Sequence, residues 1–167
     1  MERLLTANYI EHTDVLIKIM AVRIGRDNTI QIKRDVLDEI CLSIKPYKYE
    51  TGGIIGINES GIISDFQFDE TYSSNPFEYS PNVDFLNQVI NGEWANKNIA
   101  FVGFVHSHLN NDTLSMQDVV YARDILKENS CLANILIGVI NLDENKNYVE
   151  MYLVNMQENF KICYKVI

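Results

Sequence analysis

The run IAFVGFVHSH at residues 99–108 restricts the possible folds of this chain more than any other segment. It is rich in β-branched and aromatic residues and too short for a surface helix, so it predicts a buried β-strand. Side chains alternate between the two faces of a strand, so every second residue shares a face. The face that carries the histidines would then hold Val102, Phe104, His106 and His108.

Three further segments show helical periodicity. Residues 34–44 carry apolar residues at helical spacing, and Pro46 prevents the helix from continuing. A short helix with apolar residues from 85 to 90 is predicted to end at the helix-terminating pair Asn91-Gly92. Residues 115–128 are predicted to form a third helix, with Ser115 as its N-cap.

The rest of the chain alternates strands with turns. ETGGIIGI and IISDFQF predict two strands joined by a turn at residues 58–61, and the Ser-, Asn- and Pro-rich residues 71–82 predict an exposed loop. Strands and helices alternate unevenly, so the predicted class is α/β with a mixed β-sheet between helices. Further predicted elements are an opening hairpin (15–24, a turn at 25–28, then TIQIK), strands ANILIGVI and YVEMYLV, and an additional strand in the tail NFKICYKVI.

The charge balance narrows the classes of partner. The 167 residues carry 23 acidic against 14 basic side chains, a net charge of −9, so the overall field repels phosphate backbones and anionic lipid. Neither nucleic acid nor a membrane is an expected partner. The acidity would favour a basic protein partner, although an ordinary soluble cytoplasmic protein has the same composition.

The N-terminal residues and the cysteines bear on location. Acidic residues interrupt the N-terminal stretch, which excludes a signal-peptide core, and no apolar run approaches the roughly 20 residues that span a bilayer. Cys41, Cys131 and Cys163 are odd in number and form no C-x-x-C pair, which fits a reducing compartment, and each is predicted to be a small buried hydrophobe. We therefore expect a cytoplasmic protein.

Two histidines on one strand face can bind one metal ion, and Asp118, in the first turn of the next helix, can supply a third ligand. Each feature also has a purely structural explanation. The histidines can be satisfied by hydrogen bonds, and Ser115-x-x-Asp118 is also a helix-capping arrangement. A His₂-carboxylate set leaves the fourth position of a zinc site open, as in catalytic rather than structural zinc sites.

A hydrolase with such a site also needs an acid that takes a proton from water and is not itself a ligand. Glu50 is the candidate, although it can equally be an exposed acid at a strand end. The Gly52-Gly53 pair after it allows close backbone approach at a crowded place.

Together, Glu50, His106-Ser107-His108 and Ser115-x-x-Asp118 resemble the JAMM motif of the MPN+ (JAB) metallopeptidases, over roughly residues 30–155. The resemblance implies one MPN/JAB-like domain over residues 1–167, with a cytidine-deaminase-like layout. It also implies roles for the five residues: His106, His108 and Asp118 bind Zn²⁺, Glu50 activates water, and Ser115 stabilises the oxyanion.

Members of this family cleave peptide or isopeptide bonds that follow the C-terminal glycine of ubiquitin-like proteins. ETGGIIGI looks most like the bacterial branch, whose members often act beside ubiquitin-like activating and conjugating enzymes, some in anti-phage defence. The implied function is therefore a zinc-dependent isopeptidase or peptidase. Two alternatives are a non-catalytic MPN interaction module and a zinc hydrolase that acts on another small conjugate or a sulfur-carrier protein.

The chain departs from the family pattern at two points. Leu109 replaces the usual proline after the second histidine, and six residues (109–114) rather than seven separate that histidine from Ser115. These departures bear on where Ser115 lies relative to the oxyanion. Asp112 in this loop is a further acid, predicted to be solvated rather than metal-bound.

Overall fold

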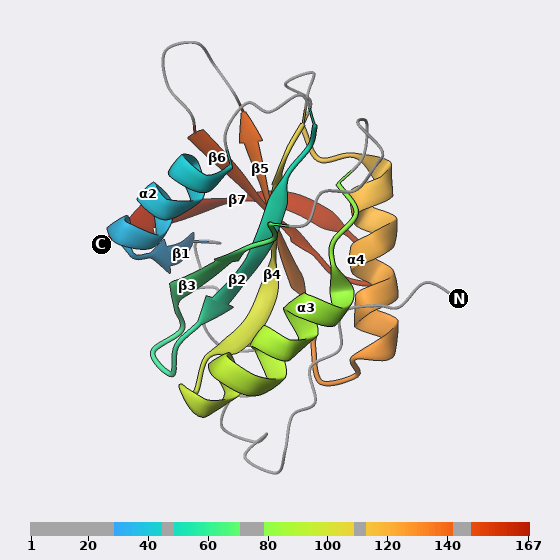
Figure 1. Cartoon of the computed structure of the whole chain (residues 1–167). Helices are drawn as coiled ribbons and strands as arrows, with labels where there is room; N and C mark the ends of the chain where they lie inside the picture. Colours follow the sequence, from blue (N-terminus) through green and yellow to red (C-terminus); the bar gives the residue numbers. More distant parts are fainter. Residues whose placement is uncertain (1–28, 45–48, 71–78, 109–112, 142–147) are drawn as a thin grey trace.

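The computed structural model describes residues 29–44, 49–70, 79–108, 113–141 and 148–167. Within these ranges seven strands form one mixed sheet accompanied by three α-helices, which confirms the predicted α/β class (Figure 1). The strands are β1 (Thr29–Ile32), β2 (Gly52–Ile57), β3 (Ile62–Phe68), β4 (Ala100–Ser107), β5 (Ile135–Asn141), β6 (Tyr148–Val154) and β7 (Asn159–Val166). The helices are α2 (Arg34–Ser43), α3 (Val83–Gln88) with its π-helical continuation η1 (Val89–Trp94), and α4 (Met116–Glu128).

The sheet closes on itself in the order β1-β3-β2-β4-β5-β6-β7. The tail strand β7 makes the closure, because residues 159–162 pair antiparallel with β6 and residues 163–166 pair parallel with β1. Two other pairs, β1 with β3 and β4 with β5, are also parallel. The predicted extra strand in the tail is therefore confirmed, but the closed sheet it forms was not predicted.

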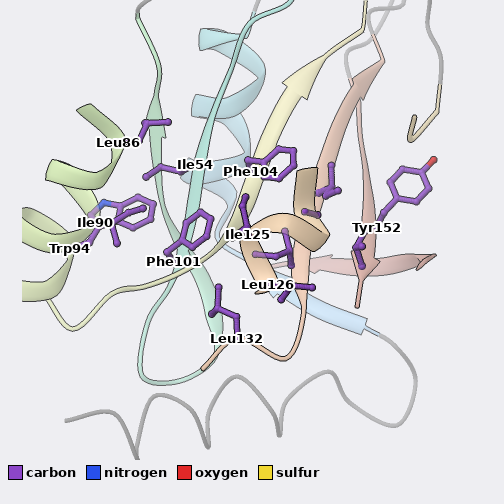
Figure 2. Close-up of a cluster of buried hydrophobic side chains, with 14 of the residues drawn as sticks. Ile54, Leu86, Ile90, Trp94, Phe101, Phe104, Ile125, Leu126, Leu132 and Tyr152 are labelled. Atoms are coloured by element: carbon purple, nitrogen blue, oxygen red, sulfur yellow. The ribbon is translucent and has the colours of Figure 1, made fainter. Parts of the chain in front are cut away.

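Two apolar clusters cover the opposite faces of the sheet. One lies between the sheet and α2, and contains Ile40, Ile63 and Val105. The other lies between the sheet and α3, η1 and α4; Figure 2 shows this cluster, with Ile54, Trp94, Phe104 and Ile125. We call these the α2 face and the α4 face, and in Figure 1 the helices lie on the corresponding two sides of the sheet.

The prediction that Val102 shares a face with Phe104 is wrong. Ile55 of β2 pairs with Gly103 and Gly56 pairs with Phe101, so Val102 is the extra residue of a β-bulge. The bulge reverses the alternation on its N-terminal side. Val102 consequently packs on the α2 face, while Phe104 packs on the α4 face.

The predicted helix end at Asn91-Gly92 is also wrong. The helix continues as η1, whose i→i+5 hydrogen bonding brings residues five apart close to one side, so Val89 and Trp94 are both buried against the sheet. Helical residues continue to position 96, and the chain turns away at Asn98, which has φ 55°, with the Ile99 N–H donating to the Trp94 carbonyl. This is a Schellman-type ending with asparagine in the left-handed position, and burial of Trp94 outweighs the local stop signal.

The remaining sequence predictions concern the cysteines, several segments that the structure does not describe, and membrane-spanning helices. The three cysteines are free, as predicted, but none is fully buried. Cys41 and Cys131 are partly exposed, and Cys163 is exposed because it alternates on β7 with buried Ile162. The predicted hairpin segment 15–24 and its turn, and residues 71–78 and 109–112, lie outside the described residues. Among the described helices, none has the length and apolar character needed to cross a membrane.

Candidate metal centre

The candidate site lies where β4 ends and α4 begins, on the α4 face of the sheet (Figure 1). The ring atoms His106 Nε2 and His108 Nε2 are 2.8 Å apart. The carboxylate of Asp118 completes the group, with Oδ1 at 3.1 Å from His106 Nε2 and Oδ2 at 3.4 Å from His108 Nε2. Both histidines are buried, at 2% and 7% exposed, so the three donor atoms converge on one enclosed point.

These donor groups fit a zinc ion. In a tetrahedral site with bonds of about 2.0–2.1 Å, two ligand atoms lie about 3.3 Å apart. The two nitrogen–oxygen separations lie close to that value, and the nitrogen–nitrogen separation is somewhat shorter. Two imidazole nitrogens and a carboxylate are also a chemically suitable set for zinc.

Asp118 is placed for both of the roles that the sequence left as alternatives, helix capping and metal binding. It forms a capping box with Ser115: the Asp118 N–H donates to Ser115 Oγ at 3.1 Å, and the Ser115 N–H donates to Asp118 Oδ2 at 2.9 Å. The same carboxylate faces both histidines. Burial alone would raise the pKa of this carboxyl, but hydrogen bonds from the histidines and from Ser115 hold it well below its usual range. Asp118 is thus held as a carboxylate, the form a metal requires.

Ser115 also uses its hydroxyl in this arrangement. Its O–H donates to Asp118 Oδ2 at 2.7 Å while its oxygen accepts the Asp118 N–H. A substrate oxyanion would compete with that carboxylate for the hydroxyl hydrogen. The oxyanion role of Ser115 stays a prediction.

Glu50 precedes β2, whose residue Gly52 is paired with His106. Ser107 fixes this junction from the other face of β4: its N–H donates to the Thr51 carbonyl at 2.9 Å, and its Oγ accepts the Thr51 N–H at 3.1 Å. Glu50 is partly buried, and its Oε2 accepts the backbone N–H of Tyr79 at 3.2 Å. This clamp holds the start of β2 beside the end of β4.

The prediction of close backbone approach at Gly52 is confirmed. A Cβ atom there would lie 2.6 Å from the Val105 carbonyl oxygen, 2.7 Å from Tyr79 Cε1 and 2.9 Å from His106 Cβ. Only glycine fits between the strand and these groups. A side chain at this position would displace the surroundings of His106.

Aromatic rings enclose His106. Tyr79 stacks on it, with ring centroids 6.1 Å apart and planes at 17°, and Phe104 lies at 5.8 Å. Tyr79 belongs to the segment 71–82 that the sequence predicted as an exposed loop, but it is partly buried and its ring packs against His106. Sequence reasoning also missed Asp69, a buried carboxylate that accepts the Tyr79 hydroxyl at 3.1 Å, because one acid after a strand carries no recognisable signal.

Comparison with known proteins adds information on the fold. By sequence, no protein-family profile and no curated protein matches this chain. Among solved structures, a protein of Desulfitobacterium hafniense, determined in solution, superposes with a TM-score of 0.67 at 14% identity, over 83% of this chain and 92% of that one. A JAB1/MPN domain protein from Archaeoglobus fulgidus superposes with a TM-score of 0.49 at 16% identity, over 83% of this chain and 98% of that one. The first similarity establishes that this chain and the Desulfitobacterium protein share a fold.

Proposed function

We propose that this chain is a zinc-dependent hydrolase of the MPN+ type that cleaves the bond following the C-terminal tail of a ubiquitin-like protein. One observation carries the proposal: His106, His108 and Asp118 converge on a single point. Glu50, two residues before β2, completes the set of residue types of the JAMM motif in the order the motif has them. Three protein ligands rather than four are typical of catalytic zinc.

A bound zinc ion would polarise the scissile carbonyl and lower the pKa of a coordinated water to about 7. Glu50 is suited to take the proton from the attacking water on its carboxylate and to deliver it to the leaving amine, because it is not among the three donor groups. The Tyr79 N–H restricts the rotation of this carboxylate. The Ser115 hydroxyl is the proposed donor to the oxyanion.

The proposal extends to the setting in which the enzyme acts. The substrate would be a ubiquitin-like protein of a bacterial conjugation system in the cytoplasm, with its activating and conjugating enzymes as functional neighbours. The resemblance of Glu50-Thr51-Gly52-Gly53 and the following residues to the bacterial branch supports this part. Anti-phage defence is one such setting.

Metal analysis of the purified protein tests the site first. We expect about one tightly bound zinc per chain, because three ligands at these spacings suffice. His106→Ala and Asp118→Ala should each lose the metal. The assignment is wrong if both variants retain as much zinc as the parent.

The substrate is tested with a ubiquitin-like protein fused to a reporter through its Gly-terminated tail. Zinc-loaded protein should release the reporter, and replacing the last glycine with a bulky residue should prevent release, because glycine lets the backbone approach the metal. Binding of the fusion without cleavage would support a non-catalytic module. Neither binding nor cleavage would favour a different conjugate as substrate.

A further inference from the structure

Asp69 is a buried carboxylate outside the JAMM motif. It follows β3 directly and is 1% exposed. Its Oδ2 accepts two hydrogen bonds, from the Tyr79 hydroxyl at 3.1 Å and from the Asn82 N–H at 2.7 Å. A buried carboxylate is destabilising unless such donors satisfy it. The arrangement therefore ties two points of the chain, Tyr79 and the N-cap of α3, to the end of β3.

Tyr79 connects this carboxylate to the metal centre in two ways. Its backbone N–H donates to Glu50 Oε2, and its ring stacks on His106. The ring also lies so close to Gly52 that no side chain fits there. It thus occupies a slot between β2 and His106.

The hydroxyl of Tyr79 is held as a donor. Burial, and then the charge of Asp69, raise the pKa of Tyr79 well above its usual range. The proton consequently stays on the phenol oxygen, and the bond to Asp69 fixes the far end of the ring. Loss of either partner would leave the ring free to turn away from His106.

We propose that Asp69 is a positioning residue of the metal centre, acting through Tyr79 to orient the His106 ring and the Glu50 carboxylate. The inference rests on the proposed function, because it takes His106 as a zinc ligand and Glu50 as the proton acceptor. Changes in groups that orient metal ligands typically weaken metal binding about 10- to 100-fold. Asp69 accepts the Tyr79 hydroxyl, and the Tyr79 N–H donates to Glu50, so Tyr79 is the residue that would transmit the effect of Asp69.

The test measures the binding of zinc alone, by competition with a chromophoric chelator, and the visible spectrum of the cobalt(II)-substituted protein. Tyr79→Phe keeps the ring and the backbone N–H and removes only the bond to Asp69. Asp69→Ala removes that bond and also the bond from the Asn82 N–H. Each should raise the zinc dissociation constant about tenfold or more and alter the cobalt bands. The double variant should bind zinc no more weakly than Asp69→Ala, because Asp69→Ala already removes the one bond that Tyr79→Phe deletes.

Two further variants separate positioning from charge and from stability. Asp69→Asn should bind zinc like the parent, because its amide oxygen can accept both bonds without a charge. Asn129→Ala removes a buried side chain that donates to the Ile125 carbonyl at 2.8 Å, at the far end of α4. It should lower the melting temperature and leave zinc affinity and the cobalt bands unchanged.

The inference is wrong if Tyr79→Phe matches the parent in both measurements while His106→Ala abolishes zinc binding. The metal site would then exist, but the bond between Asp69 and Tyr79 would not contribute to it. It is also wrong if Asp69→Asn binds as weakly as Asp69→Ala, since charge would then be responsible. If Asp69→Ala does not fold, Tyr79→Phe and Asp69→Asn still decide. If the parent binds no zinc, the proposed function fails, and the inference fails with it.

Discussion

The two faces of the sheet are built from the same strands but have different tasks. On β4, Val105 points to the α2 face and is fully buried among apolar side chains. Its neighbours Phe104 and His106 point to the α4 face, where Phe104 ends the apolar packing and His106 begins the polar site. The α2 face thus supports β4 from behind, and the α4 face can hold two buried imidazoles beside a partly buried carboxylate.

Buried polar groups also have different kinds of partner on the two faces of the sheet. Ser107 lies between the two histidines in sequence but faces the other side, where its hydroxyl satisfies the Thr51 backbone. On the α4 face two histidines and Asp118 converge on one point, and Asp118 also pairs locally with Ser115. Four predictions test whether the α2 face contributes only to stability while the α4 face also carries the candidate site.

The largest effect is expected on turnover, for Glu50→Gln, which removes a proton acceptor and changes the side chain little otherwise. Glutamine keeps the size and polarity of the side chain but cannot accept the proton, so turnover of the reporter fusion should fall by about 10² to 10⁴. Zinc content and melting temperature should remain those of the parent. Undiminished turnover would remove Glu50 from the mechanism.

The next effect compares equivalent isoleucines on the two faces. Ile40 of α2 and Ile125 of α4 are both fully buried, so replacing either with alanine should lower the free energy of unfolding by about 2 to 5 kcal/mol. Only Ile125→Ala should also weaken zinc binding, because the Ile125 side chain packs α4, which carries Asp118, against the sheet. Chemical denaturation and zinc titration of the folded variants check this; equal loss of zinc affinity in both would contradict the division.

Ser115→Ala should have a smaller effect on two quantities. Losing the capping hydroxyl should cost about 1 kcal/mol of stability. Turnover should fall by about 10² to 10³ if the hydroxyl donates to the oxyanion. A melting curve recorded with the kinetics separates the two, and a stability loss with unchanged turnover would limit Ser115 to capping.

The smallest effect is expected at Gly92, on the α4 face but away from the site. A Cβ there would meet no atom within 4 Å, and the position lies inside a helix. Gly92→Ala should therefore stabilise the protein by about 0.5 to 1 kcal/mol without altering zinc binding. A destabilised variant would show that η1 requires glycine. The same substitution at Gly52 should destabilise the protein, because a side chain there would collide with Tyr79.

Local sequence patterns predicted much of the fold. The β-branched run up to His106 formed a core strand, residues 34–44 formed a helix that ends within a residue of the predicted position, and Ser115 caps the next helix. Spacing also predicted that two histidines and Asp118 could face one another, and the structure brings them together. These features depend on backbone periodicity and on neighbours a few residues away.

Other features depended on contacts between residues far apart in the chain. The bulge at Val102 and the closure by β7 arise from pairing with other strands, and η1 continues past Gly92 because Trp94 is buried against the sheet. Sequence by itself determined which side chains the candidate site contains, since their types and spacing are local properties. Only the tertiary structure decided that Asp69 and Tyr79 adjoin it, because burial and hydrogen-bond partners are set by how the strands and loops pack together.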